Sequence, residues 1–247
     1  MKLHDITIKK QKEQTLLLAN QQLDQVLYKT THELKAPILS ALGLVNLAEQ
    51  SFTKEKDQYI AIIKKSLLRL NSFIDEMTHF FRHDKLTLQR QHIDLKQLLT
   101  EDIEILQNQL HTHQIAMTIS VSGVAFFYSD RIRVKTIVTN ILSNAIKYCD
   151  VRKTSSFVKI DADGTEDYSD ICVTDNGIGI EPKAMNRIFE LFFPGTSQSQ
   201  GTGIGLFIVK DTIERLKGSI EVNSIYGEGA TFHIRIPNQF QQPNEAE

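Results

Sequence analysis

The sequence predicts an α+β protein in two parts, an antiparallel helical hairpin followed by an α/β sandwich. Two observations lead to this prediction. Up to about residue 85, apolar residues recur at alternating intervals of three and four, as they do along one side of a long helix. Beyond residue 85, short segments that alternate between apolar and polar residues are interleaved with helical patterns, which is typical of a sheet covered by helices.

Two apolar stripes define the predicted hairpin, with the segment 50–57 as its connection. The first stripe consists of Leu16, Leu23, Leu27, Leu34, Ala41, Leu44 and Ala48, with Asn20, Thr30 and Pro37 at equivalent positions. The second consists of Ile60, Ile63, Leu67, Leu70, Ile74, Met77 and Phe81. One hairpin leaves much of these stripes uncovered, so we expect a second copy to complete a four-helix bundle.

The second part predicts helices and strands in alternation. We expect helices over Leu95–Leu110, from Ser129 or Asp130 to Tyr148, and from Gly203 to a basic last turn with a terminal glycine at Lys217-Gly218. We expect antiparallel strands at Ile115–Val121, Phe157–Asp161, Asp170–Thr174, Ser219–Asn223 and Ala230–Ile236. A turn at Tyr226–Gly229 joins the last two strands.

Composition excludes several classes of protein. The 247 residues include 28 Lys and Arg and 30 Asp and Glu, which gives a formal net charge of -2. The chain is therefore not basic overall, and its charge does not predict nucleic acid as a partner. No run approaches the roughly 18 apolar residues of a membrane span. Cys149 and Cys172 fit no metal spacing and are predicted to be small buried hydrophobes in a reducing compartment. We therefore expect a cytoplasmic chain.

His32 is the first candidate for chemistry. If Thr30 and Leu34 face the interior of the hairpin, His32 faces solvent. An exposed neutral imidazole is a competent nucleophile, and Glu33 can hold or receive its ring proton. Pro37 lacks a backbone N–H and should loosen the helix beside His32. An ordinary surface histidine, one of eight in the chain, would leave the same pattern.

Asn140, Asn144 and Lys147 are spaced i, i+4, i+7 and form one polar line beside the apolar face of their helix. Two amides and an ammonium suit a hydrated divalent cation and phosphate oxygens. A solvated helix face would carry the same residues.

Two glycine segments predict close approach to a ligand. Gly177 and Gly179 follow a strand that ends at Asp175, whose carboxylate can accept from an exocyclic amine. The segment Gly201–Gly205 opens a helix, and amides at a helix N-terminus bind phosphates. A plain turn and a flexible helix start are the alternatives. Between the two segments, Phe189–Phe193 predicts either an aromatic anchor for a mobile lid or ordinary core.

In this order along the chain, these segments resemble the motifs of the sensor histidine kinases of two-component signalling. The resemblance extends from about Tyr28 to Pro237. It rests on a phosphoacceptor box at Tyr28–Pro37, an asparagine box at Asn140–Tyr148, glycine boxes at Asp175–Gly179 and Gly201–Leu206, a phenylalanine box at Ile188–Phe193 and a short last motif at Gly227–Phe232.

The resemblance implies a role for each matched residue. His32 would be phosphorylated with Glu33 as its acidic neighbour, Asn144 would hold Mg²⁺, Lys147 would reach phosphate and Asp175 would recognise adenine. The other residues expected at the ATP site are Asn140, Tyr148, Gly177, Gly179, Phe189, Gly201, Thr202, Gly203, Gly205, Leu206 and Thr231.

The family architecture implies a domain order and a reaction. The expected parts are a signalling helix at 1–25, a dimerisation and phosphotransfer domain at 26–85, an ATP-binding domain at 86–238 and a polar tail at 239–247. The ATP-binding domain would be of the GHKL type, shared with type II topoisomerases and Hsp90 chaperones. The reaction would pass the γ-phosphoryl group of ATP to His32 and then to an aspartate in the receiver domain of a response regulator.

Three further features bear on this interpretation. Ala36 occupies the place where family members that dephosphorylate their regulators carry Thr or Asn, so we expect weak phosphatase activity. Pro194 replaces a residue that is often basic after the phenylalanine box. The segment Asp5–Lys10 resembles the exit of a PAS sensor domain, so we expect an upstream sensor that these residues do not include.

Other classes of protein explain fewer of the motifs. A related serine kinase of the anti-sigma-factor type would not need the hairpin that carries His32. A non-catalytic dimer would not need an intact Asn144 and Asp175 together with the glycine segments. A coiled-coil protein without enzymatic activity would account for residues 16–81 and nothing beyond them.

Overall fold

The computed structural model describes residues 28, 30–49, 53–84, 87–123, 127–193 and 202–239. The chain divides into two compact units, Met1–His79 and Phe80–Glu247. The expected signalling helix at 1–25, with Leu16 and Leu23, and the tail beyond residue 239 lie outside the described residues. No helix in the described part combines the length and the apolar character that a membrane crossing requires.

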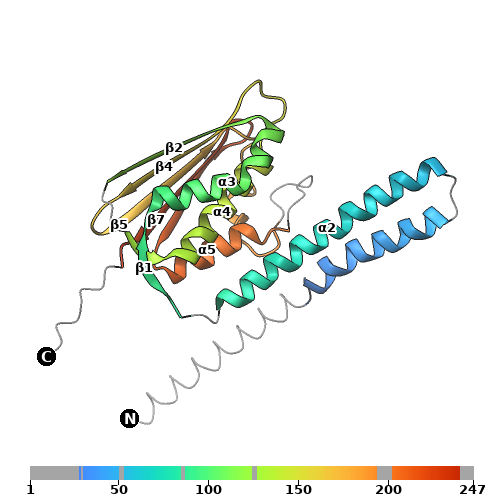
Figure 1. The fold of residues 1–247 in the computed structure, drawn as a ribbon, viewed down its shortest axis with the longest axis horizontal. Helices are drawn as coiled ribbons and strands as arrows, with labels where there is room; N and C mark the ends of the chain where they lie inside the picture. Colours follow the sequence, from blue (N-terminus) through green and yellow to red (C-terminus); the bar gives the residue numbers. More distant parts are fainter. Residues whose placement is uncertain are drawn as a thin grey trace, which may run out of the picture. The chain divides into compact units, whose positions relative to one another are not determined.

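The first unit contains the predicted hairpin. A helix over residues 30–49 and helix α2 (Thr53–Asp84) run side by side in opposite directions (Figure 1). The predicted inner positions of the first helix are buried or half-buried, namely Thr30, Leu34, Pro37, Ala41, Leu44 and Ala48. The helix continues through Pro37, so any loosening there does not interrupt it.

The apolar stripe of α2 differs from the prediction. Ile63, Leu70 and Met77 are buried or half-buried, whereas Ile60, Leu67 and Ile74 are exposed. The inner side of α2 instead follows Tyr59, Ile63, Ser66, Leu70, Phe73 and Met77. The predicted stripe therefore combined two neighbouring lines of residues on α2, and only the line with Ile63, Leu70 and Met77 is buried within the hairpin. The side chain of Phe81 lies outside the description.

A five-stranded sheet forms one layer of the second unit. Its strands are β2 (Ile115–Gly123), β4 (Ser156–Gly164), β5 (Tyr168–Asp175), β7 (Gly229–Pro237) and β6 (Ser219–Ile225), in that spatial order. The last three pairings are antiparallel, as predicted, but β2 and β4 are parallel, so the prediction of antiparallel strands was wrong for this pair. Parallel neighbours need a long crossover, and a helix supplies it here.

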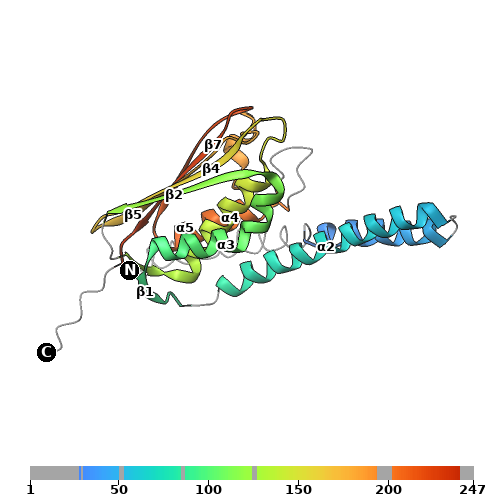
Figure 2. The ribbon, with the colours of Figure 1, turned by 45° about the horizontal axis from the view of Figure 1, so that its top comes forward.

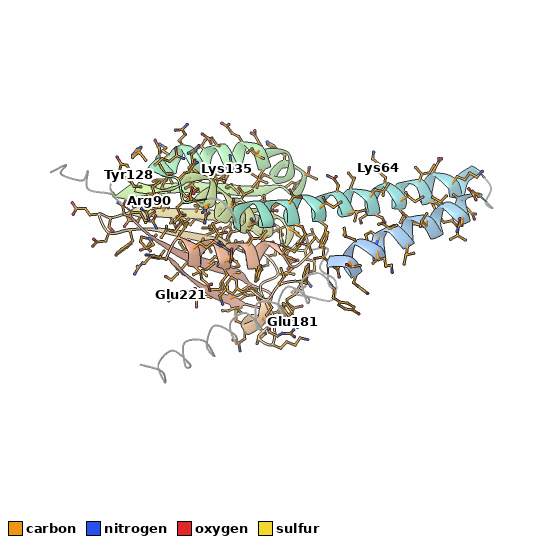
Figure 3. All side chains as sticks on the ribbon, turned by 90° about the horizontal axis from the view of Figure 1, so that it is seen from below. Lys64, Arg90, Tyr128, Lys135, Glu181 and Glu221 are labelled. Atoms are coloured by element: carbon orange, nitrogen blue, oxygen red, sulfur yellow. The ribbon has the colours of Figure 1, made fainter. Side chains whose placement is uncertain are left out.

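Three helices form the second layer, on one face of this sheet (Figures 1 and 2). They are α3 (Leu95–His113), α4 (Arg131–Lys147) and α5 (Gly205–Arg215). Two short strands that the sequence did not predict, β1 (Arg90–Ile93) and β3 (Phe127–Asp130), pair beside them, as Arg90 and Tyr128 show in Figure 3. A short 3-10 helix, η1 (Met185–Arg187), precedes the phenylalanine segment.

The sheet separates apolar from polar side chains. One transverse row toward the helices consists of Ile119, Ile160, Val173, Phe232 and Val222. The adjacent row on the other face consists of Ser120, Asp161, Cys172, His233 and Glu221. Because side chains alternate along each strand, this pattern fixes the register of every strand. Asp175 ends β5 on the helix-covered face, in line with Val173.

The ends of the helices are held by local contacts. Asp130, one of the two predicted caps, caps α4, and its Oδ1 accepts from the Arg133 backbone N–H at 3.1 Å. At the end of α5, Lys217 rather than the predicted Gly218 adopts the left-handed conformation, with φ of 59°. Gly218 donates its N–H to the carbonyl of Ile213 at 2.9 Å. Cys149 and Cys172 are free and half-buried, so they are less buried than predicted.

Candidate functional site

The polar line on α4 forms as predicted. Asn140 and Asn144 are half-buried and Lys147 is exposed, while Val138 and Ile141 on the neighbouring face are fully buried. Burial of the apolar face fixes the rotation of the helix, so the amides are held beside the core. Lys147 places its Nζ 5.1 Å from the ring centroid of Tyr148, at the end of the helix.

The start of α5 meets the middle of α4. Gly205, the first residue of α5, lies so close to Asn140 that a Cβ atom there would be 2.8 Å from Asn140 Oδ1. Asn140 is itself oriented, because its Nδ2 donates to the Thr136 carbonyl at 2.8 Å. The asparagine line and the second glycine segment, far apart in sequence, therefore converge.

Asn144 provides an available oxygen ligand in this region. Within the described residues its side-chain amide makes no hydrogen bond, although it is half-buried one turn beyond Asn140. Mg²⁺ prefers oxygen ligands and keeps several waters. The Asn144 amide oxygen, one turn along α4 from the asparagine that meets the start of α5, would therefore fit as a ligand of Mg²⁺. No group of three His, Cys, Asp or Glu residues in the described part of the chain would form a closed metal site.

Asp175 is oriented by the loop that follows it. Its Oδ1 accepts from the Gly177 backbone N–H at 2.8 Å. Burial raises the pKa of this carboxyl above its ordinary value, and hydrogen bonds from the Gly177 and Ala230 backbones and the charge of Lys153 oppose that shift. A half-buried acceptor of this kind suits a donor on a bound ligand.

The first glycine segment is seated against the end of α4. A Cβ on Gly177 would overlap the carbonyl oxygen of Tyr148, and the same carbonyl accepts from the Ile178 N–H at 3.0 Å. Gly179 has φ of 66°, and a Cβ there would overlap the carbonyl of Ile225. Both positions therefore need glycine, and the segment is a packed part of the site rather than a plain turn.

The phenylalanine segment is anchored at its end. Phe192, with φ of 63°, donates its N–H to the carbonyl of Gly203 at 3.0 Å. The Arg187 guanidinium lies 4.5 Å from the Phe193 ring centroid, and Lys210 Nζ lies 5.8 Å from that of Phe189. Thr202, Phe189 and Leu206 are half-buried around this anchor. The predicted positions Pro194 and Gly201 lie outside the described residues.

Thr231 is not brought to the same place. It lies on β7 opposite Thr174, and the two hydroxyls are 3.2 Å apart. Thr174 and Asp175 are consecutive in an extended strand, so they face opposite sides of the sheet. The backbone of the preceding residue, Ala230, bonds Asp175 instead. The motif in the sequence does not show whether Ala230 or Thr231 adjoins Asp175, because that depends on how β7 pairs with β5.

His32 lies in the other unit, on the outside of the first helix. Its side chain is 71% exposed, and its Nδ1 is 3.9 Å from an oxygen of Glu33. This distance is longer than a hydrogen bond but within the range of an ion pair. Ala36, one turn further along, is exposed on the same side. The imidazole is therefore accessible, as predicted from the position of Thr30 and Leu34.

The sequence of the chain is similar to those of known proteins. Residues 129–239 match the family described as "Histidine kinase-, DNA gyrase B-, and HSP90-like ATPase". Sensor protein GacS of Pseudomonas syringae pv. syringae is 31% identical over 229 residues, which are 86% of this chain and 24% of GacS. The chain spans about a quarter to a third of the length of the curated relatives it matches.

Two solved structures have a similar fold. Full-length ShkA in complex with AMPPNP is 26% identical with a TM-score of 0.61, covering 87% of this chain and 45% of ShkA. Histidine kinase ThkA in complex with response regulator protein TrrA is 20% identical with a TM-score of 0.69, covering 89% of this chain and 64% of ThkA. The second likeness concerns the fold alone.

Proposed function

We propose, since the chain belongs to the sensor histidine kinases of two-component signalling, that it phosphorylates His32 with ATP and passes the phosphoryl group to an aspartate of a response regulator. The observation that carries the proposal is the convergence of Asn140 on α4 with Gly205 on α5, one helical turn from Asn144, whose side-chain amide makes no hydrogen bond within the described residues. Polar amides and an anion-binding helix start then occupy one side of the same domain.

The nucleotide has a defined orientation in this proposal. Asp175 accepts from the exocyclic amine of adenine, and Gly177 and Gly179 allow the base to approach the backbone. The N-terminus of α5, with Gly203 and Gly205, faces the phosphates, and Lys147 supplies a positive charge. Tyr148, Phe189, Thr202, Leu206 and Gly201 complete the proposed site. Thr231 bonds Thr174 on the other face of the sheet and takes no part in it.

Asn144 is the residue that we assign to Mg²⁺. The ion, when bound, neutralises charge on the phosphate oxygens of ATP. The protein groups contribute orientation, because Asn140 is fixed by Thr136 and Asn144 lies one turn further along the same rigid helix.

The chemistry at His32 is a phosphoryl transfer with a simple balance. The Nδ1 atom faces Glu33, so Nε2 is the nitrogen that attacks the γ-phosphorus. A nitrogen–phosphorus bond forms, the bond between the γ-phosphorus and the bridging oxygen breaks, and ADP leaves with that electron pair. The proton on Nδ1 is stabilised or accepted by Glu33. Transfer to a carboxylate of the regulator then regenerates the imidazole.

A homodimer explains the uncovered side of the hairpin. On the first helix, Ile38, Leu42 and Val45 are exposed, and each directly follows an inner residue. On α2 the same relation holds for Ile60, Leu67 and Ile74. Each helix therefore has a second apolar line next to its covered one, which a second hairpin would bury in a four-helix bundle.

The wider pathway is proposed by analogy. ThkA was solved with a response regulator, and a receiver domain of that kind is the acceptor we propose here. Curated relatives are several times longer than the matched region, so we also propose an upstream sensor domain of the PAS type. Ala36 cannot position water, and we therefore propose weak phosphatase activity toward the regulator.

The test is incubation of the full chain with γ-labelled ATP and Mg²⁺, followed by acid and alkali treatment. Wild type should acquire a label that survives alkali and is lost in acid, and His32→Gln should remain unlabelled. His233→Gln is a matched control, because His233 is an exposed histidine on the polar face of the sheet. An acid-stable label that persists in His32→Gln would favour a serine or threonine acceptor and contradict the proposal. Nucleotide binding without label would favour the non-catalytic dimer.

A further inference from the structure

Lys153 has contacts unlike those of an ordinary surface lysine. It lies in the turn between α4 and β4, and its Nζ donates to the backbone carbonyls of Asn176 at 2.6 Å, Gly177 at 3.2 Å and Glu228 at 3.0 Å. An ammonium group has three N–H donors. Each of them therefore has a carbonyl acceptor, and the half-buried side chain is fixed in place.

Lys159 and Lys183, in the described part of the same domain, instead have carboxylate partners. Lys159 is 2.7 Å from an oxygen of Asp161, and Lys183 is 2.7 Å from one of Glu181. Both lysines are exposed, and surface pairs of this kind contribute little to stability. Lys153 differs because it neutralises converging backbone dipoles, which would face one another unfavourably without a cation between them.

The three carbonyls belong to two separate segments, and Lys153 itself comes from a third. Asn176 and Gly177 belong to the loop after β5, and Glu228 to the turn between β6 and β7. These segments also touch directly, since the Gly227 N–H donates to the Ile178 carbonyl at 2.7 Å. Lys153 therefore lies at the junction where the loop after β5 is held against its neighbours.

The same loop orients Asp175. The Gly177 N–H that bonds Asp175 Oδ1 belongs to the peptide whose carbonyl, that of Asn176, accepts the shortest of the Lys153 bonds. Holding this peptide by its oxygen fixes the direction of its N–H, because a peptide unit is planar. The positive charge also opposes the rise in the pKa of Asp175 that burial causes.

We infer that Lys153 is a positioning residue, which holds the Asn176–Gly177 peptide so that Asp175 selects adenine over other bases. The inference rests on the proposed function, because it takes the proposed nucleotide site as its premise. Lys153 does not touch the ligand in this account. Its loss loosens base recognition and leaves the phosphate side, formed by α4 and α5, unchanged.

The experiment compares the dissociation constants of ADP and GDP for the full chain. Lys153→Ala should weaken ADP binding about tenfold and leave GDP binding unchanged, so that the preference for adenine falls by the same factor. Lys153→Met, which keeps most of the aliphatic stem, should behave alike if the alanine variant folds poorly. Lys159→Ala, from the neighbouring strand β4, is the matched control and should bind as wild type does.

Chemical rescue distinguishes positioning from general support of the fold. Ethylammonium should restore part of the ADP affinity of Lys153→Ala, because it can occupy the space of the missing ammonium, whereas tetramethylammonium at equal ionic strength should not. Equal weakening of ADP and GDP with a lower melting temperature would overturn the inference, and so would unchanged ADP affinity in both variants. Wild-type protein that binds no ADP would instead overturn the proposed function, and this inference with it.

Discussion

Gly205 and Asn140 are so close that a single added methyl group would not fit between them. A Cβ on Gly205 would lie 2.8 Å from Asn140 Oδ1, while Asn140 Nδ2 is already held by the Thr136 carbonyl. The amide cannot move away without losing that bond. Because Gly205 has no side chain, α5 can start beside Asn140.

Gly205→Ala should weaken nucleotide binding about tenfold, which corresponds to one displaced hydrogen bond. The backbone of Gly205 is helical, and alanine is the better helix former, so the thermal stability should change little. Titration with ADP and a melting curve measure the two effects. Gly43→Ala is the control, because a Cβ at Gly43 has no neighbour within 4 Å. Wild-type affinity in Gly205→Ala would show that Asn140 does not need its observed position.

Asp175→Asn should separate stability from binding. Burial raises the pKa of Asp175, so the carboxyl stabilises the fold most when protonated, and this contribution is lost as pH rises through the raised pKa. At neutral pH the variant should therefore melt at a higher temperature than wild type, and the two should converge below the ordinary carboxyl pKa. ADP affinity should fall by about 10- to 100-fold, as expected for losing a charged acceptor. Joint loss of stability and binding at neutral pH would contradict this.

Leu67→Lys should dissociate the proposed dimer. Leu67 is 50% exposed in the single hairpin and lies on the uncovered apolar line of α2. Each copy would lose about 2 kcal/mol of leucine burial, so the dimer dissociation constant should rise by roughly a thousandfold. Sedimentation over a range of concentrations measures this. Gln58→Lys introduces the same charge at another exposed position of α2 and should leave the dimer intact.

Ala36→Thr should increase phosphatase activity toward a phosphorylated regulator by about tenfold, because a hydroxyl one turn from His32 can orient a water molecule. The rate of phosphate loss from the regulator is the measurement. Ala36→Val has nearly the same shape without the hydroxyl and should stay at the wild-type rate. Equal rates in the threonine and valine variants would remove Ala36 from the explanation.

Much of the fold follows from local patterns in the sequence. The Asp130 cap, the apolar face of α4 and the alternation in β5 and β7 each depend on residues close together in the chain, and each was predicted. The parallel pairing of β2 with β4 depends on which edge of the sheet a strand joins, and alternation carries no information about that. The short strands β1 and β3 have too few residues to show a period.

In the candidate site, too, only the residues that belong to local sequence patterns could be predicted. Glycine segments and asparagines were visible because their spacing matches one helix face or one loop. Lys153 was not, because its partners are backbone carbonyls 23, 24 and 75 residues further along the chain, and any sequence supplies carbonyls. Thr231 and Ala230 differ by one position, and only the register of β7 against β5 shows which of them adjoins Asp175.

Because side chains alternate between the two faces of the sheet, insertions and deletions within β5 are restricted. Removing or inserting one residue between Tyr168 and Thr174 would move Asp175 from the helix-covered face of β5 to the opposite face. Every residue of the strand would remain, yet the carboxylate would no longer meet the loop that orients it. Insertions and deletions in relatives should therefore fall in the turns around residues 151–155 and 165–167, while the number of residues in β5 is as constrained as the identity of Asp175.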